Sequence, residues 1–204
     1  MIVADGIYYA IGLTAGGLIV SWIGRPLYGL PFYVLAVFCL YFFRDPDRQI
    51  PEGDVAVSPA DGKVVAVLAQ GAGAYRISIF LNVFDVHINR SPIAGAITQV
   101  KYQQGRFAVA SKEIASSENE MNTVTVEGGG STVVFKQIAG LIARRIVFNK
   151  KPGDKVAKGE RVGMIKFGSR TDVIFGPEWE IAVREGDRVQ AGSSIIARLR
   201  DSAR

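Results

Sequence analysis

Residues 151–159 read KPGDKVAKG, and residues 184–192 repeat the pattern as REGDRVQAG. Each copy places a Gly-Asp pair before a basic residue and a valine, and each ends on a glycine. Gly-Asp pairs favour tight turns, so each copy predicts a turn, a short strand and a second turn. A third stretch, Pro51–Val55 with Pro59–Val64, has a similar composition. Short strands between such turns are typical of a β-sandwich or barrel.

The region from Asp54 to Arg204 fits this prediction and is long enough for one domain with its own core. The predicted strands are Val64–Leu68, Tyr75–Leu81, Gly95–Tyr102, Thr123–Glu127, Thr132–Gln137, Arg144–Phe148, Arg161–Lys166, Asp172–Phe175 and Ile195–Leu199. Gly128–Gly130 predicts a hairpin turn, and Phe107–Asn119 a loop or short helix. We expect a mainly β fold, with α+β as the alternative. The repeats resemble the flattened β-sandwich of lipoyl and biotinyl carrier domains in fold, not in function.

Two uncharged apolar runs precede this region. Ile7–Ile23 and Pro26–Phe43 are each close to the ~20 residues that a helix needs to cross a bilayer, and Arg25 separates them. Asp5 makes the N-terminus acidic, which argues against a cleaved signal peptide. We predict a membrane-anchoring helical hairpin in residues 1–48, followed by a β-rich domain in residues 49–204. A buried apolar hairpin in a soluble core is the alternative.

Charge and residue counts exclude several classes of function. Arg44 and Arg48 follow the second run, which favours a cell-membrane protein with its globular part on the cytoplasmic face. The net charge of +5 is dispersed, which indicates anionic lipid headgroups as a partner and not nucleic acid. Cys39 is the only cysteine and His87 the only histidine. A disulfide within the chain and a zinc site built from His and Cys are therefore excluded, and we expect no metal.

The single histidine lies in the sequence FDVHINRSP, residues 84–92. Tyr75–Leu81 predicts a buried strand leading to it, and Arg90-Ser91-Pro92 predicts a closing turn. We therefore expect His87 at the end of that strand, where a rigid frame aims the chain's only imidazole. A core histidine satisfied by a backbone carbonyl is the alternative interpretation.

A Gly-Ser pair, Gly168-Ser169, supplies a nucleophile beside an open carbonyl. Glycine leaves its own carbonyl sterically accessible, and the following Ser Oγ can attack it through a five-membered transition state, given a base. His87 is the only imidazole available as that base, and Asp61 is a candidate carboxylate to orient or charge it. Gly168-Ser169 and Asp61-Gly62 also have a simpler interpretation, because Gly-Ser and Asp-Gly pairs commonly form turns with no further role.

Three motifs occur in order: PADGKV at residues 59–64, FLNVFDVHINRSP at residues 80–92 and FGSRTDV at residues 167–173. Together they strongly resemble the phosphatidylserine decarboxylases, specifically the short, membrane-anchored branch that includes archaeal-type enzymes. The resemblance covers nearly the whole chain. It includes FRDP at residues 43–46 and GLIARRI at residues 140–146.

The resemblance implies a zymogen that cleaves itself between Gly168 and Ser169, giving a large subunit (1–168) and a small subunit (169–204). Ser169 would become a covalent pyruvoyl group, the only cofactor. Its ketone would form a Schiff base with the serine headgroup of phosphatidylserine and release CO2, leaving phosphatidylethanolamine. His87 is then the implied proton carrier in decarboxylation and a candidate base in processing. The implied partners are the lipid, the two subunits and, as a further candidate, other copies of the chain.

Two positions depart from the family pattern. Longer relatives have a second histidine three residues after the first, where this chain has Arg90. Arg90 is therefore a candidate to hold the substrate carboxylate or phosphate. The family often has Asn-Glu-Arg-Asn where this chain has Met121 in place of the arginine. Headgroup recognition would then depend on other arginines. These candidates are Arg106, Arg144, Arg145 and Arg170, each of which could equally be a solvated surface charge.

A rival function from a different class needs none of this chemistry. The repeated Gly-Asp turns and the apolar hairpin would suffice for a membrane-tethered β-sandwich adaptor or carrier module. Such a module would stay a single intact chain, and it would give no reason for Asp61, His87 and Ser169 to converge.

Overall fold

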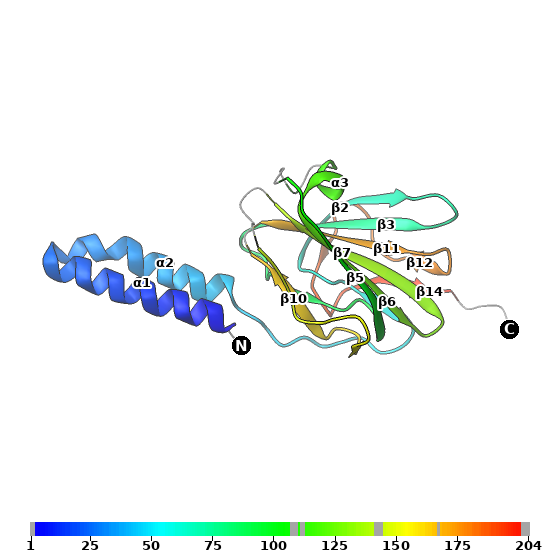
Figure 1. Ribbon diagram of the computed structural model, residues 1–204, viewed down its shortest axis with the longest axis horizontal. Helices are drawn as coiled ribbons and strands as arrows, with labels where there is room; N and C mark the ends of the chain where they lie inside the picture. The colour runs from blue at the N-terminus through cyan, green and yellow to red at the C-terminus, as the bar shows by residue number, and fades with distance from the viewer. Residues whose placement is uncertain (1–2, 107–109, 111–112, 141–144, 167, 201–204) are drawn as a thin grey trace. The chain divides into compact units, whose positions relative to one another are not determined.

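The computed structural model describes residues 3–106, 110, 113–140, 145–166 and 168–200. It has two compact units, Met1–Asp47 and Arg48–Arg204 (Figure 1). The first unit is helical, and the second consists mostly of strands. The prediction of a mainly β fold behind an apolar N-terminal helical segment is confirmed.

The first unit is a helical hairpin of α1 (Ala4–Ile23), the short 3-10 helix η1 (Pro26–Gly29) and α2 (Leu30–Phe42). Within the described residues, α1 is the one helix long and apolar enough to cross a membrane, and Pro26–Phe42 is a shorter apolar segment. Glycines let the helices approach closely: a Cβ at Gly17 would lie 2.7 Å from the ring of Tyr33. Small residues at helix contacts, with large apolar side chains facing outward, are typical of helices packed in lipid.

The second unit is built on one eight-stranded sheet in which every neighbouring pair is antiparallel. Its order is β13 (Arg188–Val189), β2 (Gly62–Ala69), β3 (Tyr75–Leu81), β11 (Ser169–Phe175), β7 (Ser131–Ala139), β6 (Met121–Gly128), β5 (Gly95–Gln103) and β9 (Lys155–Val156). The strand β11, which begins at Ser169, therefore lies in the interior of the sheet between β3 and β7.

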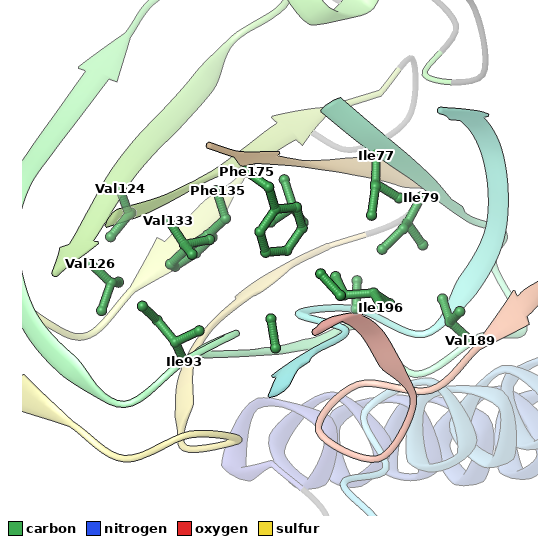
Figure 2. Packing of buried hydrophobic residues seen from close by; sticks show 14 of the residues in the cluster. Ile77, Ile79, Ile93, Val124, Val126, Val133, Phe135, Phe175, Val189 and Ile196 are labelled. Atoms are coloured by element: carbon green, nitrogen blue, oxygen red, sulfur yellow. The ribbon is translucent and has the colours of Figure 1, made fainter. Parts of the chain in front are cut away.

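Two three-stranded sheets and a short helix complete the unit. One sheet is β1 (Val55–Val57), β14 (Ile195–Leu199) and β12 (Trp179–Ile181); the other is β4 (Ile88–Arg90), β10 (Arg161–Ile165) and β8 (Ile146–Phe148). The helix is α3 (Ala115–Glu118). Figure 2 shows how side chains of the large sheet, Ile79 and Phe135 among them, pack with Ile93 and Ile196 in the hydrophobic core. Burial of this apolar surface is the main force that holds the strands together.

The two Gly-Asp repeats adopt the same conformation, which explains their similarity in sequence. Gly153 and Gly186 have φ of +95° and +100°, values that glycine adopts without strain. Asp154 and Asp187 each cap their own turn, accepting from the backbone N–H three residues earlier at 2.9 and 3.0 Å. The short strands that follow are β9 and β13, at the two ends of the large sheet.

A second repeat accompanies the first, and the sequence prediction assigned it differently. Ser58–Val64 and Ser91–Ile97 share Ser-Pro at the start and Gly at the fifth position, again 33 residues apart. In both, the Ser Oγ donates to the carbonyl two residues later, at 2.6 and 2.7 Å. Gly192 N–H donates to Ser58 O and Gly159 N–H to Ser91 O, each at 2.8 Å. Each Ser-Pro segment is thus bonded to the end of one Gly-Asp repeat, whereas the sequence prediction placed Pro59–Val64 in a third copy of that repeat.

The strand boundaries agree in part with those predicted from the sequence. The bounds of β3 and β14 are those predicted, and the hairpin turn between β6 and β7 is confirmed, with Gly129 and Gly130 at φ of +60° and +76°. The strand β11 begins at Ser169 and not at Asp172. The short strands β9 and β13 lie inside the two Gly-Asp repeats, where a short strand was predicted. The strands β1, β4 and β12 were not predicted, because each has only three residues, too few to show alternation.

Candidate active site

The Gly168-Ser169 peptide bond lies where the chain enters β11. Gly168 has φ of +62°, in the left-handed region, and no heavy atom lies within 4 Å of where its Cβ would be. Ser169 is fully buried, and its Oγ has no hydrogen-bond partner. A buried hydroxyl without a partner costs free energy, so such groups tend to mark functional positions. The oxygen therefore makes no competing hydrogen bond, and it belongs to the residue that follows the Gly168 carbonyl.

His87 contacts the amide of Gly168. Its Nε2 accepts from the Gly168 N–H at 3.3 Å, while its Nδ1 lies 2.9 Å from the Asp85 carbonyl oxygen. A carbonyl can only accept, so Nδ1 carries the proton and Nε2 presents its lone pair. The structure thus brings together two sequence-predicted site residues, His87 and Gly168, with the imidazole in the tautomer of a base.

The position of His87 in the fold differs from the prediction. The strand β3 ends at Leu81, and His87 follows a tight turn and directly precedes β4. That turn is fixed by side chains: Asp85 Oδ2 accepts from Asn82 N–H at 2.9 Å, and Asn82 Oδ1 accepts from Phe84 N–H at 2.8 Å. The rigid frame around His87 is therefore an Asx-type turn and not a strand end.

Asp61 is held by groups other than His87. Its Oδ2 accepts from Arg48 Nη2 at 2.7 Å, and its Oδ1 accepts from the Ala191 N–H at 2.8 Å. Burial raises the pKa of the Asp61 carboxyl; the Ala191 N–H and the Arg48 guanidinium act in the opposite direction, and the charge of Asp85 adds to the rise. Asp61 and Asp85 also line one polar cavity of about 290 Å³, together with Arg188. Asp61 thus fixes the end of the second Gly-Asp repeat near the His87 turn.

The candidate headgroup arginines fall in different surroundings. Arg90 is buried, and its Nη1 donates to the Gly159 carbonyl at 3.0 Å, so it fastens the end of the first Gly-Asp repeat. Arg144 lies outside the described residues. Arg145 is exposed, and its carbonyl accepts from Lys166 N–H at 3.2 Å, two residues before Gly168. Met121 is buried in a small apolar cluster with Ala115 and Ile138, so its side chain has no access to a headgroup.

Arg170 belongs to a buried charged network that sequence reasoning did not predict. Its Nε donates to Asp172 Oδ1 at 2.7 Å, and its Nη2 donates to Ser78 Oγ at 2.6 Å and Glu113 Oε2 at 3.1 Å. The other oxygen of Asp172 accepts from Ser116 Oγ at 2.6 Å. The network therefore links β11 and β3 to the segment that contains α3. These contacts fit a structural role for Arg170 better than headgroup binding.

A row of buried amides was also missed. Gln137 Nε2 donates to Asn89 Oδ1 at 2.9 Å, and Asn122 Nδ2 donates to Gln137 Oε1 at 3.1 Å. Gln137 is the cross-strand neighbour of Thr171, whose buried Oγ1 has no hydrogen-bond partner. The available signal was a glutamine near the end of the strand β7, followed by two apolar residues, and an asparagine two residues after the single histidine. Polar groups thus gather at the end of the core where Ser169 lies.

Removing Arg170 should strongly destabilise the fold. Arg170→Met would remove the 2.7 Å ion pair of the buried Asp172 carboxylate and leave it only the longer one to Arg76, at 3.9 Å. Breaking a buried ion pair by removing one partner costs about 3–5 kcal/mol. The matched control is Arg106→Met: that side chain is 84% exposed and 3.6 Å from Glu118, so its loss should cost at most about 1 kcal/mol. Denaturant unfolding of both variants, each combined with Ser169→Ala so that the chain stays in one piece, would measure the difference in their free energies of unfolding. Equal stability of the two would contradict the structural role of Arg170.

The described residues hold no group of three or more His, Cys, Asp and Glu side chains that could bind a metal ion. What the site offers is the Ser169 hydroxyl beside the Gly168 carbonyl, with the His87 imidazole in contact with the Gly168 amide. This arrangement suits acyl transfer within the chain itself, in which a side-chain oxygen displaces a backbone nitrogen.

Comparison with known proteins identifies the family. A family model described as phosphatidylserine decarboxylase matches residues 35–197. A phosphatidylserine decarboxylase proenzyme of Solibacter usitatus (strain Ellin6076) is 67% identical over 200 residues, which cover 98% of each chain. A protein of the same name from Magnetococcus marinus is 42% identical over 199 residues, covering 93% of this chain and 90% of the relative. Because the family model matches most of the chain and the Solibacter relative matches nearly its full length, this chain belongs to the phosphatidylserine decarboxylase family.

Proposed function

We propose that this chain is a proenzyme that cleaves itself between Gly168 and Ser169 and then converts phosphatidylserine to phosphatidylethanolamine and CO2. The observation that carries the proposal is the buried, unpartnered Ser169 Oγ beside Gly168, whose N–H is bonded to the only imidazole in the chain. The relatives named as proenzymes support the cleavage, and membership of the family supports the decarboxylation.

The cleavage chemistry uses groups of the chain alone. Ser169 Oγ adds to the Gly168 carbonyl carbon, the C–N bond breaks, and the hydroxyl proton passes to the Ser169 nitrogen, which gives an ester. Loss of the Ser169 Cα proton then expels the Gly168 carboxylate and leaves dehydroalanine. Hydrolysis consumes one water and releases ammonia. His87 Nε2, with its lone pair directed at this segment, is the proposed proton carrier for these transfers.

The residues present fit a pyruvoyl group at position 169. Ser169 starts a strand held on both sides, and its hydroxyl makes no bond that the conversion would break. The Thr171 hydroxyl, two residues along the same strand face, is a second buried donor without a partner. When formed, the pyruvoyl group supplies a ketone that binds the substrate amine and withdraws electrons as CO2 leaves.

The chain's own residues would bind the lipid and move the proton. We assign His87 the proton transfer at the carbon that loses CO2, because the Asp85 carbonyl holds its Nδ1 proton and leaves Nε2 toward position 169. For the phosphate we favour the basic pair Arg144 and Arg145. The second of these is exposed and lies on the segment bonded to Lys166. The contacts of Arg90 and Arg170 argue against either as a ligand.

The apolar hairpin would keep this chemistry at the membrane. We propose that residues 1–48 anchor the enzyme in the cell membrane and that residues 49–204 form the catalytic domain on its cytoplasmic face. The length and composition of α1 support the anchor, and Arg44 and Arg48 support the orientation. The large and small subunits, 1–168 and 169–204, would stay together because β11 of the small subunit pairs with β3 and β7 of the large one.

An assay on the purified full chain in detergent micelles tests the function. CO2 should be released from phosphatidylserine, with phosphatidylethanolamine as the product, and phosphatidylglycerol should release none because it has neither the amine nor the carboxylate. Phenylhydrazine, a carbonyl reagent, should stop the reaction and add its mass less one water to fragment 169–204, because the hydrazone forms with loss of water. A fully cleaved protein that releases no CO2 from phosphatidylserine would refute the proposed activity.

A further inference from the structure

Gly140 lies directly against the carbonyl group that the proposed cleavage attacks. It follows β7, next to Ala139, which is the cross-strand partner of Ser169. A Cβ built on Gly140 would lie 2.2 Å from the Gly168 carbonyl oxygen and 3.1 Å from its carbonyl carbon. Cβ atoms essentially never come within 3.0 Å of another heavy atom, so any side chain at position 140 would displace this carbonyl.

The backbone at position 140 has little room to retreat. The same Cβ would lie 3.1 Å from the Cβ of Ala110. Just before Gly140, β7 is fixed on its other edge, where Ala139 N–H donates to the Glu120 carbonyl at 2.9 Å and Asn119 Nδ2 donates to the Ala139 carbonyl at 2.7 Å. By contrast, no heavy atom lies within 4 Å of the Cβ position of Gly168 itself, so the Gly168 peptide has more room to shift than the backbone at Gly140.

We propose that Gly140 is a positioning residue for self-cleavage. Its missing side chain lets the backbone hold the Gly168 carbonyl in the orientation that Ser169 Oγ attacks. The inference rests on the proposed cleavage at Gly168-Ser169. An added Cβ must move the carbonyl oxygen by about 1 Å to restore ordinary contact, and a misplacement of that size can slow a reaction about 10²-fold.

Close approach of a glycine to a carbonyl is not special in itself, and this provides a matched control. A Cβ on Gly95 would lie 2.3 Å from the Glu127 carbonyl oxygen, between β5 and β6. Gly95→Ala therefore introduces the same kind of clash in the same sheet, against a carbonyl with no part in the proposed chemistry. Comparing the cleavage rates of the two variants therefore separates the effect of moving the reacting carbonyl from the effect of disturbed packing.

The experiment follows the cleavage of full-length wild type, Gly140→Ala and Gly95→Ala after synthesis, with thermal stability measured in parallel. Gly140→Ala should cleave about 10²-fold more slowly than wild type, and Gly95→Ala within about twofold of it, although both should lose thermal stability. Hydroxylamine, which captures the ester as a Gly168 hydroxamate, should give that product about 10²-fold more slowly in Gly140→Ala. Adding Ala110→Gly to Gly140→Ala frees space opposite the new Cβ and should restore part of the rate.

Three outcomes overturn the inference. Cleavage of Gly140→Ala at the wild-type rate would show that the reaction does not depend on the absence of a side chain at position 140. Equal slowing of cleavage in Gly140→Ala and Gly95→Ala would assign the effect to general destabilisation. A wild-type chain that stays intact would instead refute the proposed cleavage, and the inference with it, so the two failures are distinguishable.

Discussion

Ser169→Ala should remain a single polypeptide and should show no decarboxylase activity. The substitution removes the one oxygen placed to attack the Gly168 carbonyl, and it removes no hydrogen bond because Ser169 Oγ has none. The fold should therefore keep its stability while cleavage and CO2 release are lost completely. Gel electrophoresis of the purified chain and an assay with phosphatidylserine measure the two losses.

Thr171→Val is the matched control for this prediction. Thr171 is also buried, also has a hydroxyl without a partner, and lies two residues along the same strand. Valine has nearly the same shape, so this variant loses a hydroxyl but not the nucleophile. It should cleave. If both variants stayed intact, loss of a buried hydroxyl would explain the defect, and Ser169 would not be identified as the nucleophile.

His87→Ala should slow self-cleavage by about 10²–10⁴-fold, the usual contribution of a positioned acid–base group. The imidazole is the only one in the chain, and its Nε2 contacts the Gly168 amide. Added imidazole should restore part of the rate by entering the space that the substitution leaves.

The control for His87 is Asp85→Asn. Asp85 orients the imidazole through its backbone carbonyl, while its side chain accepts from Asn82 N–H at 2.9 Å and pairs with Arg188 at 3.2 Å. Asparagine keeps the backbone carbonyl and has an amide oxygen that can accept from Asn82 N–H, so cleavage should stay within a few-fold of wild type. A His87→Ala chain that cleaves as fast as the wild type would exclude His87 as the base and point to another group near position 168.

Much of this fold and site could be predicted from short sequence motifs. The Gly-Asp repeats predicted tight turns because their glycines need positive φ, and the structure has them there. The single histidine and the Gly-Ser pair were selected by chemistry, and the structure places His87 against Gly168. Turns and the Gly-Ser pair depend on residues that are adjacent in the chain, so they can be predicted from a single sequence.

Long-range partners could not be predicted in the same way. Arg170 was a candidate headgroup ligand, with a solvated surface charge as the alternative, because an arginine shows no partner in sequence. In the structure Ser78 and Glu113, 92 and 57 residues away, accept its hydrogen bonds. For the same reason the predicted strand began at Asp172, whereas β11 begins at Ser169. Arg170 resembles a turn residue in the sequence, where its ion pair with Asp172 is not evident. Asp61 was read as a partner of His87, whereas its carboxylate binds Arg48 and Ala191.

Intact-protein mass spectrometry can show whether this chain makes its own catalytic group from Ser169, when the purified full-length wild type is measured beside Ser169→Ala. We expect two wild-type polypeptides divided between Gly168 and Ser169, with fragment 169–204 starting in pyruvoyl in place of serine, and an undivided variant. A single wild-type mass equal to the full sequence, or a fragment 169–204 that begins with an unmodified serine, would rule out this self-processing.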